Sequence, residues 1–354
     1  MRRYATAVVT AALLGIGTTA WAQEKVIFDT DFNTMGDDGQ AFVMLAQAMK
    51  EGKIDLLGVT VVSGNQWLMQ GVADAERAVE RMGLAGEVEV YAGANYPLLH
   101  DAAMLEAEQA LYGKGYSGAW RKPEPKSREE LTAPPDGFAS EVKVSDENAV
   151  GWLIDTIRAN PDEVTILAVG PLTNIALAMR IDPGIVPLIK RIIYMGGAVE
   201  VPGNVTPAAE FNWWFDPEAA KIVVRAPVEH VVVPLDVTDT AAFDKSVFDA
   251  ITASDTPVAR MFEATYGKRF ADDPEATAYV WDTIAAAYLL DESIVTDSID
   301  VHLDVNAQFG PDYGRSLGHA RNPPIGTQPA TVIRRVDLDR FWAMYSDLLG
   351  RPIE

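Results

Sequence analysis

The sequence predicts a single α/β domain built on a doubly wound, mostly parallel sheet with helices on both faces. Short runs rich in β-branched and apolar residues recur along the chain, mostly without polar alternation, and helical patterns lie between them. Unbroken apolar strands are typical of a parallel sheet that is covered on both faces. The 354 residues are enough for one large core, and no shift in composition marks a boundary between domains.

Six predicted strands alternate with five predicted helices in the first two thirds of the chain, as βαβ units require. The strands are expected at 26–28, 57–62, 88–91, 164–169, 192–195 and 231–235. The helices are expected at 40–49, 73–82, 149–159, 172–179 and 217–224. Further on, we expect helices at 247–266 and 277–290 and an added strand at 299–309.

One stretch, residues 93–144, is rich in Pro, Gly, Glu and Lys. It is too long to be a simple connection in a compact domain, and such excursions are usually functional loops. We therefore expect it to act as a lid.

The N-terminus has the pattern of a signal peptide. Arg2 and Arg3 precede an apolar run at 7–14, and Ala20-Trp21-Ala22 forms a small-residue cleavage site. A transmembrane helix is less well supported, because the apolar run is short and is interrupted before the polar residues that follow. We expect residues 1–22 to be removed, leaving 23–354 as the folded domain of a secreted or periplasmic protein.

The composition excludes several classes of partner. Without Arg2 and Arg3 the chain has 27 basic and 51 acidic residues, a net charge of −24, which argues against nucleic acids and anionic membranes. There is no cysteine, so neither a disulfide nor a thiolate nucleophile is possible. Small neutral substrates and cations fit this charge better.

Four carboxylates lie within ten residues at the end of the first predicted strand: Asp29, Asp31, Asp37 and Asp38. They repel one another unless a cation is present, and ligands bind at this end of open α/β sheets. Hard oxygen ligands select Ca²⁺ or Mg²⁺. The alternative interpretation is a solvated acidic turn that caps the next helix.

A second alternative is a phosphatase of the haloacid dehalogenase type, in which Asp29 would be the nucleophile. In such enzymes Thr follows the Asp-x-Asp two residues on, whereas this chain has Asn33 there. That chemistry also leaves the pair Asp37 and Asp38 unexplained.

Polar residues follow a later strand that ends in Gly-Gly. Asn204, Glu210 and Asn212 offer donors and acceptors suited to sugar hydroxyls. Asp216-Pro217 is typical of a helix start, and the turn at 170–174 could place backbone carbonyls near a metal. Asp282 opens a late apolar helix and, taken alone, is most simply an N-cap.

In order along the chain, these segments resemble the nucleoside hydrolase family from residue 26 to about 290. The shared motifs are the Asp-x-Asp with its Asp-Asp pair, Gly64-Asn65, the segment 170–176, Met195-Gly196-Gly197, Glu210-Phe211-Asn212, the segment 216–220, and Asp282 before a helix. The resemblance implies hydrolysis of the N-glycosidic bond of ribonucleosides by an enzyme that uses Ca²⁺ and releases free base and ribose. Attack by a calcium-bound water would invert C1′ without a covalent intermediate.

The resemblance also implies roles for individual residues. Asp31, Asp38, Asp282 and the carbonyl of Val169 would hold the calcium ion, and Asp31 would be the general base. The ribose would be bound by Asp37, Asn65, Asn204, Glu210 and Asn212. Asp29 would not bind the metal itself but would support the residues that do.

The chain departs from the family pattern at two places. Five residues, 32–36, separate Asp31 from Asp37 where the family has three, which leaves open which of Asp37 and Asp38 is the metal ligand. In the pyrimidine-tolerant branch a His that can protonate the leaving base precedes the metal aspartate, and here that residue is Trp281. Trp281 resembles the purine-preferring branch, in which tryptophans stack on the base.

Other candidates for the base site remain open. A second stacking ring could come from one of four tryptophans, although core packing is the better interpretation of each: Trp67, Trp120, Trp213 and Trp214. His100 is an alternative acid, whereas His230, His302 and His319 are interpreted as structural. A calcium-dependent nucleoside-binding protein without turnover is the alternative function, and the family resemblance leaves a homo-oligomer open.

Overall fold

The middle strands of the central sheet are buried on both faces, which explains why they show no polar alternation. The computed structural model describes residues 23–353, so the predicted signal peptide lies outside the described residues. In β1 (Glu24–Thr30), Val26 and Phe28 belong to the core on one face, and Ile27 belongs to the core on the other. The predicted parallel sheet is confirmed, because β1 pairs in parallel with both of its neighbours, β2 (Ile54–Val61) and β4 (Val164–Ala168).

Nine strands form this sheet, in the order β10-β9-β11-β6-β5-β4-β1-β2-β3. The others are β3 (Val90–Ala92), β5 (Arg191–Met195), β6 (His230–Val233), β9 (Val295–Val305), β10 (Ser316–His319) and β11 (Gln328–Val336). The chain builds outward from β1 through β2 to β3, and then returns to the other side of β1 to lay down β4, β5 and β6. The winding direction therefore reverses between β1 and β4, which is where open α/β sheets bind their ligands.

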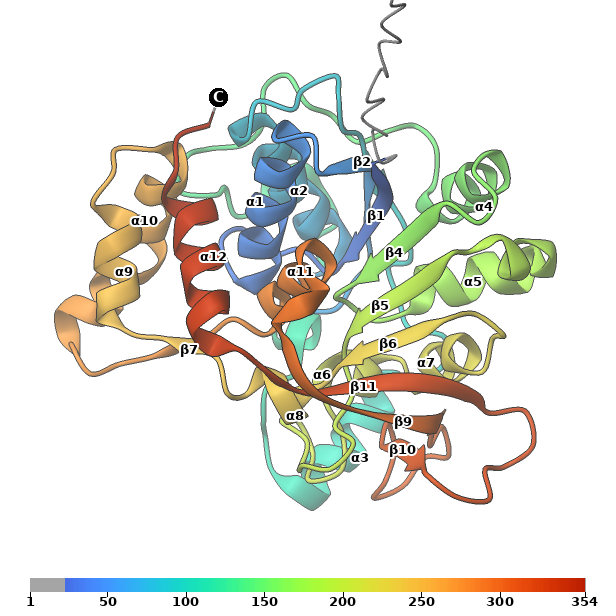
Figure 1. Cartoon of the computed structure of the whole chain (residues 1–354). Helices are drawn as coiled ribbons and strands as arrows, with labels where there is room; N and C mark the ends of the chain where they lie inside the picture. The colour runs from blue at the N-terminus through green and yellow to red at the C-terminus, as the bar shows by residue number, and fades with distance from the viewer. Residues whose placement is uncertain (1–22, 354) are drawn as a thin grey trace, which may run out of the picture.

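Helices cover both faces of the sheet (Figure 1). One face carries α1 (Asp37–Lys50), α2 (Leu68–Arg81), α11 (Trp281–Leu290) and α12 (Leu338–Gly350), and the other carries α4 (Ala149–Ala159), α5 (Thr173–Ile181) and α7 (Pro217–Val224). The remaining helices are α3 (Ala102–Tyr112), α6 (Phe211–Phe215), α8 (Leu235–Thr238), α9 (Lys245–Thr252) and α10 (Pro257–Asp272). Between residues 23 and 353, no helix is long and apolar enough to cross a membrane.

The C-terminal third differs in detail from the sequence prediction. The helix expected at 247–266 is two helices, because Thr256 accepts a hydrogen bond from the backbone N–H of Ala259 and Pro257 opens a new first turn. The helix expected at 277–290 begins only at Trp281, because Ala278–Tyr279 pairs as β8 with β7 (Ala242–Phe243). The added strand is 295–305 rather than 299–309, and it runs antiparallel to β11.

The long insertion, 93–144, contains α3 and two short 3₁₀ turns, and its C-terminal part is tied to α2. The Glu80 carboxylate accepts hydrogen bonds from the backbone N–H groups of Ser140, Glu141 and Val142. Arg81 pairs with Asp136 through two hydrogen bonds. These contacts hold the end of the insertion on the fold. That the insertion opens and closes as a lid stays a prediction.

The Glu80 contacts predict a stability that depends on pH. Burial opposes ionisation, but the three backbone donors hold the pKa of Glu80 down at about 2. A carboxyl group whose pKa is lowered in the folded state adds stability at pH values above its ordinary pKa. That stability is lost as the pH falls toward 2. We expect Glu80→Gln to lower the free energy of unfolding by about 1–3 kcal/mol at pH 7, measured by urea denaturation. The loss should shrink between pH 4.5 and pH 3, whereas Glu106→Gln on the exposed part of α3 should cost little at either pH. A loss that does not change with pH would contradict this account.

Candidate active site

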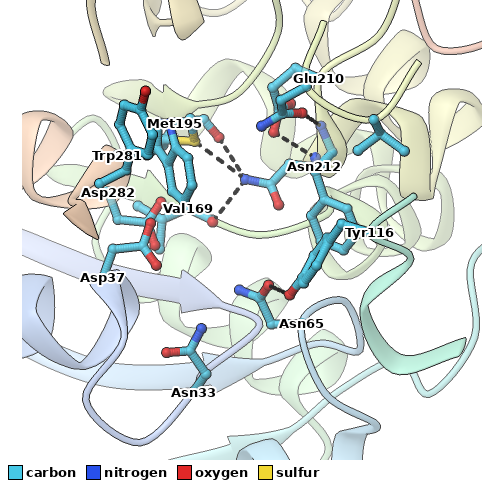
Figure 2. Close-up of a pocket in the computed structure, with 14 residues that line it drawn as sticks. Asn33, Asp37, Asn65, Tyr116, Val169, Met195, Glu210, Asn212, Trp281 and Asp282 are labelled. Carbon is cyan, nitrogen blue, oxygen red and sulfur yellow. Dashed lines mark hydrogen bonds between the residues drawn. The ribbon is translucent and has the colours of Figure 1, made fainter. Parts of the chain in front are cut away.

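A pocket of about 390 Å³ lies at the carboxyl ends of the central strands, beside the reversal between β1 and β4 (Figure 2). Eight of the predicted site residues line it: Asp37, Asn65, Val169, Asn204, Glu210, Asn212, Trp281 and Asp282. The other lining residues are Asn33, Tyr116, Met195, Val205, Phe211 and Tyr279. Segments separated by some two hundred residues in the sequence therefore meet in one cavity.

The carboxylates that follow β1 lie at and beneath the floor of this pocket. Asp38 is fully buried and accepts hydrogen bonds from the Thr30 hydroxyl at 2.5 Å and from the Asn65 side-chain amide at 3.1 Å. Asp31 is buried beside it, and its Oδ2 accepts from the backbone N–H of Asn65 at 2.6 Å. The other carboxylate oxygen of Asp31 has no hydrogen-bond partner. A solvated acidic turn is excluded, because these side chains do not face open water.

The charges of Asp31, Asp37 and Asp38 raise the pKa values of other carboxylates in the cluster. Burial and the neighbouring charges of Asp38 and Asp37 hold the pKa of Asp31 well above its ordinary range. Burial, and then the charge of Asp38, raises the pKa of Asp37 to about 7. Asp282 reaches the same cluster from the first turn of α11, and burial together with the charges of Asp37, Asp38 and Asp31 raises its pKa as well. No lysine, arginine or histidine is among the residues that line the pocket.

This cluster has the donor set of a hard divalent cation. Asp37, Asp38 and Asp282 each offer a carboxylate oxygen, and these oxygens lie within 4.8 Å of one another. The unpartnered Asp31 Oδ1 and the carbonyl of Val169 add further oxygen donors nearby. Oxygen-only ligand sets suit Ca²⁺ and Mg²⁺. The residues present therefore fit a metal ion, and Asp37 belongs to the compact group as clearly as Asp38 does.

Asn33 is a site residue that the sequence prediction missed. It comes from the five-residue loop 32–36, lines the pocket, and has a buried side-chain oxygen without a partner. A Cβ on Gly36 would lie 1.7 Å from that oxygen, so glycine at 36 leaves room for the Asn33 side chain in this orientation. The lengthened loop therefore adds a polar group to the pocket. In the sequence, the only sign of this role for Asn33 was its position between Asp31 and the pair Asp37 and Asp38.

The side chains predicted to bind the ribose lie on the pocket wall, and several are also used to build that wall. The Asn212 amide donates to the carbonyls of Val169 and Met195, and so joins the ends of β4 and β5. Glu210 caps α6 by accepting from the backbone N–H groups of Asn212 and Trp213. Burial raises the pKa of Glu210 to about 7. These contacts keep both side chains rigid at the edge of the cavity.

Aromatic rings line the pocket on opposite sides (Figure 2). Trp281 and Tyr279 stack with ring centroids 5.0 Å apart and planes 15° apart. The Trp281 indole N–H donates to Asp239, which holds the ring in place. Facing them, Tyr116 from the insertion meets Phe211 edge to face at 5.0 Å. The rings therefore frame a slot that suits a flat heterocycle.

The second aromatic ring does not come from any of the four tryptophans considered. Trp213 and Trp214 are buried in the core, while Trp67 packs against Trp120 at the base of the insertion. The pocket instead uses Tyr279, Tyr116 and Phe211. Nothing in the sequence distinguishes Tyr116 from the other tyrosines of the insertion, and only the folded chain brings it to the pocket.

Two further alternatives from the sequence are wrong, namely His100 as the acid that protonates the leaving base and Asp29 as a phosphatase nucleophile. His100 is buried among aromatic rings outside the pocket, and burial lowers its pKa to about 4, so it cannot act as the acid there. Asp29 is fully buried and accepts hydrogen bonds from Thr60 and Asn174, behind the pocket. It therefore cannot be a phosphatase nucleophile. Its position agrees with the supporting role that the resemblance implied.

The fold and the site together define a class of protein. A carboxylate cluster that fits a cation lies at the switch point of a doubly wound sheet, below a slot that is framed by aromatic rings and flanked by amide side chains. Such a pocket suits a small, neutral molecule that combines hydroxyl groups with a flat ring.

The sequence comparison identifies the family. Residues 26–343 match the family model described as inosine-uridine preferring nucleoside hydrolase, and the chain belongs to this family. The chain is 32% identical over 340 residues to the pyrimidine-specific ribonucleoside hydrolase RihB of Shigella sonnei, covering 92% of this chain and 96% of that protein. The RihB of Escherichia coli strain SE11 matches to the same extent. This chain is therefore an N-ribohydrolase, and its family is metal-dependent.

Solved structures agree with this assignment. The plant nucleoside hydrolase PpNRh1 superposes with a TM-score of 0.73 at 25% identity, covering 93% of this chain and 99% of that one. The purine-preferring ribonucleoside hydrolase from Gardnerella vaginalis gives a TM-score of 0.69 at 25% identity, with 92% and 98% covered. The similar proteins thus include relatives named for pyrimidines and one solved structure named for purines.

The repulsion in the cluster predicts how metal and stability are linked. With a chelator present, Asp282→Asn should be at least as stable as the parent, because one mutually repelling charge is gone. Calcium at about 100 times its dissociation constant should stabilise the parent by about 2.7 kcal/mol, and should stabilise the variant much less. Thermal unfolding with and without calcium measures both. Asp249→Asn, on the exposed part of α9, should respond like the parent. Equal stabilisation of the parent and of Asp282→Asn would contradict the placement of the metal.

Proposed function

We propose that this protein is a calcium-dependent hydrolase that cleaves the N-glycosidic bond of ribonucleosides and prefers purines. The observation that carries the proposal is the arrangement of the pocket. Buried carboxylates lie at one end, amide side chains lie along the wall, and the stacked Tyr279 and Trp281 lie beside them. A ribose fits between the carboxylates and the amides, with its base in the slot framed by the aromatic rings.

The carboxylates at one end of the pocket suit the positive charge that develops during the reaction. As the bond between C1′ and the base nitrogen breaks, its electron pair leaves with the base and positive charge builds on the ribose ring. Carboxylates that are already held in a buried site stabilise such charge without having to reorganise. When bound, calcium would lower the pKa of a water molecule and orient the ribose 2′- and 3′-hydroxyls.

Asp31 is the proposed general base. Its Oδ2 is held by the Asn65 backbone N–H, and its Oδ1 is free to accept a proton from the attacking water. Asp31, Asp38, Asp282 and the Val169 carbonyl are the proposed metal ligands. Asp37 is proposed to bind both a ribose hydroxyl and the metal, because it lies in the compact carboxylate group and also lines the pocket. Asn65, Asn204, Glu210 and Asn212 would hold the remaining hydroxyls, and direct attack inverts C1′.

Turnover of inosine tests the function. We expect free base to be released from inosine in the presence of calcium and no release with a chelator, measured by liquid chromatography. Asp31→Ala should lower kcat by about 10²–10⁴-fold, the usual contribution of a positioned base. Asp249→Ala should keep the parental rate, because this residue lies on the exposed part of α9. Tight nucleoside binding without release of base would instead favour a calcium-dependent binding protein.

The preference for purines rests on the stacked rings. A purine covers more of the stacked Trp281 and Tyr279 pair than a pyrimidine does, and stacking favours proton uptake by the leaving base. We expect Trp281→Ala to lower kcat/KM for inosine by about 2- to 12-fold, since an aromatic pair is worth about 0.5–1.5 kcal/mol. Uridine should be affected less. Equal losses, or a parent enzyme that turns over uridine faster than inosine, would overturn the purine preference and agree with the name of the RihB relatives.

We also propose that the protein is exported and cleaved after Ala22. This cleavage would leave Gln23 as the first residue, one residue before β1 begins at Glu24. N-terminal sequencing of protein recovered outside the cytoplasm should then start at Gln23. A protein that retains residues 1–22 would contradict the proposal.

A further inference from the structure

Tyr116 reaches the active site from the insertion, far from the sequence motifs of the family. Its residue surface is 40% exposed, yet its ring lines the pocket. The ring is held from two sides, because the Arg121 guanidinium lies 4.2 Å from its centroid and Phe211 meets it edge to face. Its position is therefore determined by packing.

The backbone around Tyr116 is anchored to the turn that carries Asn65. The Ala119 N–H donates to the Gly64 carbonyl at 2.7 Å. Gly118 has φ +54°, and a Cβ there would lie 2.2 Å from that same carbonyl oxygen. The approach is so close that only glycine permits it. The two segments meet at the backbone as well as through their side chains.

The Tyr116 hydroxyl donates to the side-chain oxygen of Asn65 (Figure 2). The nitrogen of the same amide donates to Asp38, and the Asn65 backbone N–H donates to Asp31. A bond to each end of an amide leaves it a single orientation, with its N–H pointed at the carboxylate. Asn65 therefore connects the insertion to two of the carboxylates at the pocket floor.

We propose that Tyr116 is a positioning residue that orients Asn65, and through it Asp38, so that the insertion completes the metal and ribose end of the site. This inference rests on the proposed function for its substrate. It assigns to the insertion a task that does not require the insertion to move.

A double-mutant cycle tests the proposal, using Tyr116→Phe, Asn65→Ala and the combined variant. Tyr116→Phe keeps the ring and removes the hydroxyl. Losing one hydrogen bond worth about 0.5–1.5 kcal/mol should weaken calcium binding by about 2- to 12-fold, as measured by calorimetry on the full chain. The same change should raise KM for inosine more than it lowers kcat. In the Asn65→Ala background, Tyr116→Phe should have no further effect, because the group it acts through is gone.

Tyr112→Phe is the matched control. Tyr112 lies in the same insertion and its hydroxyl also donates a hydrogen bond, but the acceptor is the Pro311 carbonyl, away from the pocket. This variant should bind calcium and inosine as the parent does. Thermal unfolding of each variant checks that the fold is intact.

Each outcome decides the proposal. Unchanged calcium and inosine affinities in Tyr116→Phe would overturn it. Additive losses, in which Tyr116→Phe has the same effect with and without the Asn65 side chain, would also overturn it, because Tyr116 would then act on its own. If neither the parent protein nor any variant released base, the proposed function would fail. The double-mutant cycle measured by calcium and inosine affinity would still test the role of Tyr116.

Discussion

Mutual repulsion among buried carboxylates is the constraint on which the rest of this structure depends. Asp31, Asp38 and Asp282 are buried, and Asp37 lies partly buried beside them at the pocket. The charges of Asp31, Asp37 and Asp38 each raise the pKa of at least one other carboxylate in this cluster. Such a cluster is costly unless a cation compensates it. The fold tolerates this cost because the surrounding sheet and helices are thoroughly packed, and because the hydrogen bonds of Thr30 and Asn65 hold part of the cluster in place.

The sheet topology explains why the carboxylates meet. The winding direction reverses between β1 and β4, so the loops that leave these strands diverge and leave a crevice. Asp31 and Val169 follow the two strands at this point, and α11 brings Asp282 from far along the chain. The site is therefore assembled from strand ends on a rigid frame. Its remaining wall comes from loops that the frame does not specify.

Much of the fold and part of the site could be predicted from residue patterns. Uninterrupted apolar strands indicated a parallel sheet with two covered faces, and the ordered motifs located Asp38, Asn65, Glu210 and Asp282. The boundaries in the last third were less predictable. Pro257 splits a continuous helical pattern, and the two-residue strand β8 delays the start of α11, because long-range pairing overrides local propensity there.

The sequence by itself determined which chemistry is available: oxygen ligands without a thiol, aromatic rings, and amides that can bind a sugar. Only the tertiary structure decided which of these groups meet. It placed Asp37 in the compact carboxylate group, turned Asn33 into the pocket, removed His100 from it and brought Tyr116 to Asn65. The physical reason is that local patterns report the periodicity of one element, whereas a site depends on distances between elements that only packing establishes.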